Sequence, residues 1–156
     1  MWDGVPVRVQ VTALWRPGAD RAALRAAAES YAGGLVRLCP RCASADHGRP
    51  RPARGPGHVS LAYGPGVVLL ARAQVPVGVD LERDDGRPPG VDGVPDLAAW
   101  TRVEAVLKAT GEGLARDPGS VRDDEAATAP LPLPSGWVGT VAVLDAGPVR
   151  VEWGEG

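Results

Sequence analysis

The chain has 156 residues, 44% of them apolar, and a formal net charge of −2. This length allows one compact unit or two small halves that share a core. The charge balance argues against a nucleic-acid partner, and no apolar run approaches the roughly 20 residues that a transmembrane helix needs. The first residues lack a secretory-signal pattern, and two cysteines are too few for a disulfide framework, so we expect a cytoplasmic protein without a membrane partner.

The first half of the chain shows the periodicities of a strand, a helix and a group of strands. Valines at every second position predict a strand over 5–15. Asp20 is the expected N-cap of a helix that runs to about Leu38. The stretch 39–57 is rich in Pro, Arg and Gly and is expected to be a loop. Three antiparallel strands in a meander are then predicted at about 58–63, 67–73 and 77–83.

The second half is predicted to contain one helix and a final hairpin. The helix spans about 97–110, with Asp96 as its N-cap and Gly111 just beyond its end. Residues 115–136 are expected to be irregular. The hairpin has predicted strands at 137–144 and 148–153 and a turn at 145–147. This order of elements predicts an α+β fold with an antiparallel sheet.

The predicted strand over 77–82 carries two carboxylates. Side chains alternate along a strand, so Asp80 and Glu82 share one face with Gly78 while the apolar residues between them face the core. The two carboxylates lie about 7 Å apart, and like charges that close repel each other unless a cation lies between them. The ordinary explanation of a lone Asp-x-Glu pair is the polar outer face of an edge strand.

The predicted helix adds one more carboxylate and an ammonium group. Trp100, Glu104 and Lys108 recur every four residues and therefore stack along one side, next to an expected buried stripe. Lys108 is the only lysine among 17 basic residues, and its spacing from Glu104 favours an ion pair within the helix. If the Asp-x-Glu strand packs here, three carboxylates and one ammonium meet. Such oxygen ligands suit Mg²⁺, and a lysine can neutralise phosphate charge. The expected stripe consists of Val103, Val106, Leu107 and Leu114.

These segments resemble the 4′-phosphopantetheinyl transferases. That family has a (V/I)G(V/I)D(V/I)E strand and a helix of pattern W-x-x-K-E-A-x-x-K-x-x-G, and this chain reads VGVDLE at 77–82 and WTRVEAVLKATG at 100–111. The family's upstream G-(R/K)-P element and V-S-L-S-H strand correspond to GRP at 48–50 and VSLAY at 59–63. The four elements follow one another in the family's order over about residues 48–114.

The resemblance implies a fold and an activity. The fold would be α+β, with two similar α/β halves at about 1–74 and 75–156, each an antiparallel sheet with a packed helix, in a monomer. The enzyme would transfer the 4′-phosphopantetheine arm of coenzyme A to a serine of an acyl or peptidyl carrier protein and release 3′,5′-ADP. Its cofactor would be Mg²⁺.

The resemblance also implies roles for single residues. Asp80, Glu82 and Glu104 would hold Mg²⁺ against the coenzyme A diphosphate. Glu104 would also help to deprotonate the serine, directly or through water, and Lys108 would contact the diphosphate and steady the departing 3′,5′-ADP. The residues that would contact coenzyme A, beside Lys108, are Arg49, Ser60 and Tyr63. Arg49 taken alone is equally well explained as a solvated loop arginine.

The chain departs from the family pattern at three places. Ala62-Tyr63 replaces the family's Ser-His pair, and Val103 replaces the lysine before the helix glutamate. Only 17 residues separate Glu82 from Trp100, where larger members have a longer segment that faces the carrier protein. These departures keep a second hypothesis open, a non-catalytic descendant of the fold that acts as a binding or accessory module.

Two cysteines and a histidine form a separate candidate site. Cys39, Cys42 and His47 have the residue types and spacing of zinc ligands, and Asp46 would be a fourth. A single Cys-x-x-Cys pair is also compatible with a redox motif or with two reduced cysteines that serve packing. The sequence leaves these alternatives open.

Overall fold

The computed structural model describes residues 4–144 and 147–156, without the side chain of Leu114. Over these ranges the chain forms strands β1–β9, helices α1 and α2, and two short 3₁₀ helices, so the predicted α+β class is confirmed. None of the helices in this part of the chain is long and apolar enough to cross a membrane. The 3₁₀ helices follow α2 and span Gly113–Ala115 and Pro118–Ser120.

The strands form three sheets. In the largest, the antiparallel strands β4, β5 and β1 are extended by β9, which pairs in parallel with β1. A second sheet, β6-β8-β7, is antiparallel throughout, and the short strands β2 and β3 pair with each other. The strand bounds are Val7–Trp15 (β1), Leu35–Arg37 (β2), Pro50–Pro52 (β3), His58–Gly64 (β4), Val67–Ala73 (β5), Val77–Arg83 (β6), Ala127–Pro130 (β7), Trp137–Val143 (β8) and Val149–Glu155 (β9).

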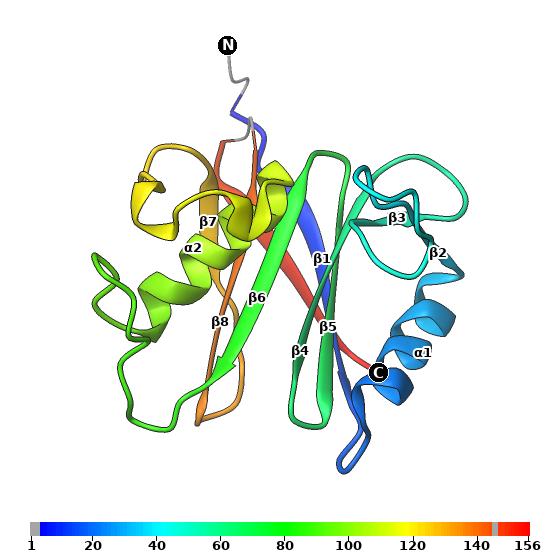
Figure 1. Cartoon of the computed structure of the whole chain (residues 1–156), viewed down its shortest axis with the longest axis horizontal. Helices are drawn as coiled ribbons and strands as arrows, with labels where there is room; N and C mark the ends of the chain where they lie inside the picture. Colours follow the sequence, from blue (N-terminus) through cyan, green and yellow to red (C-terminus); the bar gives the residue numbers. More distant parts are fainter. Residues whose placement is uncertain (1–3, 145–146) are drawn as a thin grey trace.

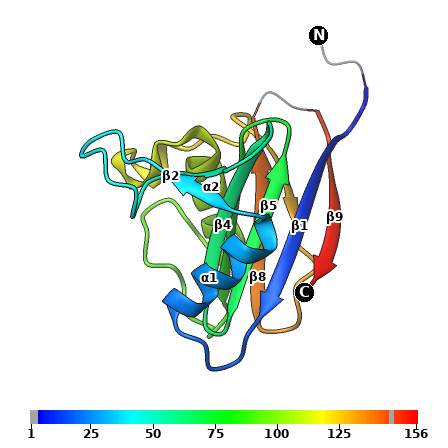
Figure 2. The same ribbon diagram turned by 90° about the vertical axis from the view of Figure 1, so that its right-hand side faces the viewer.

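The helices lie on opposite outer faces of the two larger sheets (Figure 1). Helix α1, Arg21–Ala32, covers the four-stranded sheet, and helix α2, Leu97–Thr110, covers the three-stranded sheet. Figure 2 shows α1 and β9 on the two sides of β1. The main core lies between the sheets, where apolar residues of β1, β4 and β5 meet those of β6 and β8. The alternation predicted for β6 is confirmed, because Val77, Val79 and Leu81 are buried in this core.

Glycine 78 allows α2 to approach β6 closely. A Cβ atom at Gly78 would lie 1.8 Å from the carbonyl oxygen of Ala105 and 2.6 Å from the nitrogen of Ala109. No side chain can occupy that space, so the backbone of α2 rests directly on the strand. This contact brings the second and third turns of α2 within side-chain reach of Asp80.

The predicted limits of α2 and the predicted N-cap of α1, Asp20, are confirmed, whereas the predicted end of α1 is wrong. The side chain of Asp96 accepts a hydrogen bond from Ala99 N, and Gly111 ends α2 with a φ of 79°. Gly33 ends α1 in the same left-handed conformation, with a φ of 74°. The predicted extension of α1 to Leu38 is therefore wrong, because glycine in this conformation terminates a helix. The residues beyond it form β2, and its partner β3 lies inside the predicted loop 39–57.

Three strand predictions also need correction. β6 pairs with β8 and not with β5, so the meander ends after two strands. β7 lies within the segment 115–136 that was expected to be irregular. β8 and β9 belong to different sheets, so the predicted final hairpin is wrong, and positions 145–146 of its turn lie outside the described residues. The division into halves at 74/75 stays a prediction, although β9 joins a sheet otherwise built from strands before residue 74.

Candidate functional site

Asp80 and Lys108 form an ion pair between β6 and α2. The Lys108 Nζ atom lies 2.9 Å from Asp80 Oδ1, and Asp80 as a whole is only 7% exposed. The ammonium also donates to the carbonyl oxygens of Val79 at 2.9 Å and Leu61 at 3.4 Å. Because an ammonium has three N–H donors, Lys108 uses all of them to connect α2 with β6 and β4.

The prediction of an ion pair between Glu104 and Lys108 within α2 is wrong. Lys108 turns toward the sheet, where one carboxylate and two carbonyl oxygens accept its hydrogen bonds. A buried carboxylate needs a positive partner far more than one at the surface does. Lys108 therefore forms its ion pair with Asp80 and not with Glu104.

Two buried carboxylate oxygens have no hydrogen-bond partner among the described residues. They are Asp80 Oδ2 and Glu104 Oε1. Burial raises the pKa of Asp80 to about 6, against the opposing effect of Lys108 and with added repulsion from Glu82 and Glu104. Burial also raises the pKa of Glu104, again opposed by Lys108 and reinforced by Glu82. The site therefore holds more negative charge than its single lysine can balance.

Glu82 lies at the edge of this group. Its Oε1 atom accepts a hydrogen bond of 3.3 Å from Trp100 Nε1, so the strand and the first turn of α2 are linked there too. Asp80, Glu82 and Glu104 are near enough to perturb one another electrostatically. Their oxygens are nevertheless not gathered within ligand distance, since the one such group found in the described part of the chain consists of cysteines and a histidine.

A cleft of about 570 Å³ opens beside the Asp80–Lys108 pair. It is lined from one side by β6 and α2, including Glu82, and from the other by α1, β4 and the segment 46–50. Three of its arginines were missed by sequence reasoning, which assigned no function to them: Arg21, Arg25 and Arg37. The spacing of Arg21 and Arg25 was a usable signal, because residues four apart share one face of a helix.

The four residues expected to contact coenzyme A, which are Arg49, Ser60, Tyr63 and Lys108, all line this cleft. Arg49 donates to the carbonyl oxygen of Ala109 at 3.0 Å, and burial, followed by repulsion from Arg51, lowers its pKa. Tyr63 lies under the Arg21 guanidinium, 4.0 Å from the ring centroid. Arg21 and Arg49 thus contribute positive charge to the cleft, and Arg49 does so near the end of α2.

Ser60 has a structural contact as well as a place in the cleft wall. It is buried, and its hydroxyl oxygen accepts a hydrogen bond of 3.1 Å from Val79 N. This bond joins β4 to β6, which do not pair as strands. Ser60 therefore helps to hold the two sheets together where the cleft begins.

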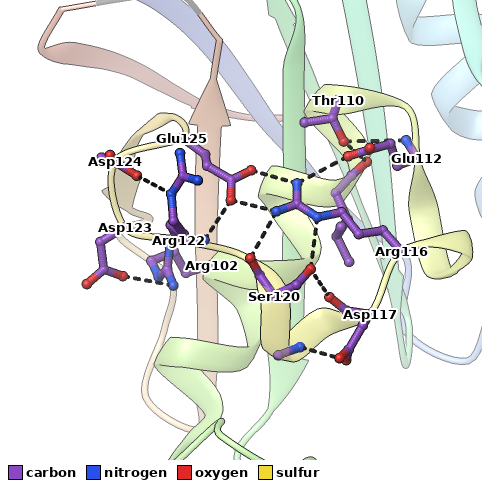
Figure 3. Close-up of polar contacts among 12 residues, drawn as sticks. Arg102, Thr110, Glu112, Arg116, Asp117, Ser120, Arg122, Asp123, Asp124 and Glu125 are labelled. Atoms are coloured by element: carbon purple, nitrogen blue, oxygen red, sulfur yellow. Dashed lines mark hydrogen bonds and ion pairs between the residues drawn. The ribbon is translucent and has the colours of Figure 1, made fainter.

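A second charged group lies beyond the end of α2, around Arg116 (Figure 3). Its guanidinium makes two contacts of 2.6 Å with the Glu125 carboxylate, and it also reaches Glu112 and Ser120. Hydrogen bonds from Arg116 and from Arg122 N lower the pKa of Glu125 to about 2. The contacts of Arg116 link residues within the segment 112–125 to one another, and Arg116 does not line the cleft.

The loop between β2 and β3 contains a third group, formed by Cys39, Cys42 and His47. Their sulfur and nitrogen atoms all lie within 4.8 Å of one another. Hydrogen bonds from the backbone N–H groups of Arg41 and Cys42 lower the pKa of the Cys39 thiol to about 7. Sulfur and imidazole ligands suit a soft or borderline ion and not Mg²⁺.

Comparison with models of known protein families finds no match to this chain. A search among curated proteins likewise finds no match. The resemblance of residues 48–114 to the phosphopantetheinyl transferases therefore rests on short sequence motifs. It supports a functional proposal only where the structure brings the residues of these motifs close together.

Proposed function

We propose that this protein is a 4′-phosphopantetheinyl transferase that moves the pantetheine arm of coenzyme A onto a carrier-protein serine. The observation that carries the proposal is the excess of buried negative charge at Asp80, which lines a cleft that also contains arginines, and at Glu104, which lies outside the cleft lining. A diphosphate ester needs cations around its oxygens, and a divalent ion between it and the carboxylates would satisfy both. The four-stranded sheet with α1 and the three-stranded sheet with α2 support the division into two halves around a cleft.

The residues present fit a magnesium ion in one respect. Asp80 Oδ2 and Glu104 Oε1 are hard oxygen donors, buried and without another partner in the described part of the chain. These two residues would hold the ion, and Glu82, whose Oε1 accepts a hydrogen bond from Trp100, would add a ligand through its Oε2 atom. When bound, Mg²⁺ would neutralise the carboxylates and the diphosphate together.

The chain's own residues would bind the substrate and move the proton. An arginine guanidinium group can donate two parallel hydrogen bonds to the oxygens of one phosphate. Arg21, Arg25 and Arg49 would therefore orient coenzyme A across the cleft. The serine oxygen attacks the phosphorus that bears pantetheine, and the bond from that phosphorus to the oxygen of 3′,5′-ADP breaks. Glu104 takes the serine proton, which its raised pKa favours. Lys108, whose three N–H donors already bond Asp80, Val79 and Leu61, would steady the departing 3′,5′-ADP through its positive charge.

The direct test is the mass of a carrier protein after incubation. Apo-carrier proteins from fatty-acid, polyketide and peptide synthesis are mixed with the enzyme, coenzyme A and Mg²⁺. Transfer adds one phosphopantetheine to the carrier and is lost with EDTA. If no carrier gains this mass under any of these conditions, the proposal is wrong.

Two observations favour the second candidate, a binding module without catalysis. All three N–H donors of Lys108 are engaged by protein atoms, and the three carboxylates are not gathered around one point. Such a module would bind coenzyme A, or its 3′,5′-ADP part, and leave every carrier unmodified. Calorimetric titration of coenzyme A, together with the carrier assay, separates the two candidates.

A further inference from the structure

The loop between β2 and β3 brings three metal-binding side chains together at the protein surface. The Cys42 sulfur lies 3.3 Å from His47 Nε2, and the Cys39 sulfur completes a group whose ligand atoms are all within 4.8 Å. Both cysteines are free. Cys42 is exposed and Cys39 is half-buried, so core packing does not explain why they meet.

The backbone of this loop is folded around the first cysteine. Cys39 N donates to Ser44 O at 2.9 Å, and Ala43 N donates to Cys39 O at 2.8 Å. Ala43 has a φ of 57°, the one left-handed non-glycine residue in the described ranges. A non-glycine residue keeps this conformation only where its surroundings enforce it. This turn lies in the segment that brings the two sulfur atoms within 4.8 Å of each other.

The loop has no apolar core of its own to maintain this shape. No residue from 38 to 48 is buried. The two ends of the loop approach closely, since a Cβ atom at Gly48 would lie 3.0 Å from Cys39 N and Leu38 O. Outside the turn, Arg25 donates to Asp46 O at 2.8 Å and ties the loop to α1. A loop with so little buried surface gains most from a covalent or metal link.

We propose that Cys39, Cys42 and His47 bind a zinc ion that staples this loop, with solvent at the fourth position. The Cys-x-x-Cys spacing, two sulfur ligands and one imidazole are those of tetrahedral zinc sites. The carboxylate of Asp46 is not in the group, so three protein ligands remain. A redox role is disfavoured, because the pair lies in a surface loop between short strands and His47 already faces one of its sulfurs.

The ion would have a consequence for the neighbouring cleft. His47 is both a ligand and a residue of the cleft wall, and Gly48 and Arg49 follow it directly. Fixing His47 would therefore fix the start of the segment that presents Arg49 to Ala109. The zinc proposal does not depend on the proposed transferase activity, since metal binding is measured without coenzyme A or a carrier protein.

The test compares the parent protein with four single variants, all purified without a polyhistidine tag from zinc-supplemented medium. The ligand variants are C39S, C42S and H47A, and H58A is the matched control because His58 is the other histidine of the chain. Zinc per chain is measured by inductively coupled plasma mass spectrometry. Cobalt is then titrated into the reduced, metal-free proteins, and circular dichroism verifies their folding.

We expect about one zinc per chain in the parent protein and in H58A, together with the absorption of tetrahedral cobalt bound to thiolate. C39S and C42S should lose both signals, and H47A should bind cobalt at least about tenfold more weakly. The proposal is wrong if the reduced parent protein takes up neither metal, or if folded C42S binds as much as the parent. Isolation of a Cys39–Cys42 disulfide that gains no metal after reduction would equally overturn it.

Discussion

Helix α2 is flanked by two charged groups that differ in how completely their polar atoms are paired. Around Arg116, five hydrogen bonds occupy the five N–H donors of the guanidinium, and Glu125 has a lowered pKa. Around Lys108, two buried carboxylate oxygens lack a partner in the described chain, and the pKa values of Asp80 and Glu104 are raised. The first group is complete as it stands, whereas the second is short of positive charge. We infer that the group around Arg116 has a structural role and that the group around Lys108 binds a ligand.

The largest effect should follow from neutralising Glu104. In E104Q the side chain keeps its shape but neither accepts a proton nor carries charge, so carrier modification should fall at least about 100-fold. Thermal stability should be unchanged or higher, because a buried unpaired carboxylate is removed. Product mass and a thermal melt measure both effects. E152Q, an exposed glutamate on β9, is the matched control and should behave as the parent. Full activity in E104Q would remove the residue from the reaction.

Removing the lysine tests the ion pair itself. K108M keeps most of the hydrocarbon chain but leaves Asp80 buried and unpaired, which should lower the free energy of unfolding by about 3 kcal/mol. The double variant D80L/K108M replaces both charges with apolar groups and should regain much of this loss. Chemical denaturation of the parent and the variants supplies the values. A single variant as stable as the parent would show that Lys108 does not balance buried charge.

The two groups should respond to pH with opposite signs. The pKa of Asp80 rises from 3.8 to about 6 on folding. As pH rises, the unfolded chain loses this proton before the folded chain does. The contribution of Asp80 to stability therefore falls between pH 3.8 and about 6, by about 3 kcal/mol from the linkage relation. The difference in unfolding free energy between the parent and D80N, measured by urea titration at several pH values, should show this slope. A flat difference from pH 4 to pH 7 would contradict the raised pKa.

Glu125 should give the smallest effect on activity and the reverse dependence on pH. Its pKa is lowered from 4.5 to about 2, mainly by hydrogen bonds from Arg116. Its stabilisation is therefore present above pH 4.5 and is lost as pH falls toward 2. E125Q should melt at a lower temperature than the parent at neutral pH and should approach it in acid. Carrier modification by E125Q should stay within about twofold of the parent, because the proposed phosphopantetheine transfer takes place in the cleft, away from Glu125. A large loss of activity would link Arg116 to the cleft.

Local patterns predicted the parts of the fold that local physics determines. The cap residues Asp96 and Gly111 determine the limits of α2, and the alternation of Val77, Val79 and Leu81 identifies the buried face of β6. Strand partners were less accessible, because β8 and β9 lie close in the chain and yet join different sheets. Their partners are chosen by which sheet buries each strand, and that information is not contained in a hairpin-like spacing.

The candidate site shows the same boundary between local and long-range information. Periodicity placed Asp80 on the face of β6 that meets α2, but it assigned Lys108 to Glu104, its neighbour in the helix. The choice of Asp80 follows from burial, which only the packed structure reveals. Arg37 could not be assigned to the cleft either, because the helix was expected to continue through it and β2 was not foreseen.

The most direct test of the proposed metal site beside Lys108 is the binding of Mn²⁺, a paramagnetic substitute for Mg²⁺. Zinc-loaded parent protein, D80N and E125Q are titrated with Mn²⁺ in the presence of coenzyme A, and free Mn²⁺ is measured by electron paramagnetic resonance. The parent and E125Q should bind about one Mn²⁺ per chain, and D80N should bind it at least about tenfold more weakly. Equal binding by the parent and D80N would contradict the assignment of the buried carboxylates to a metal–diphosphate site.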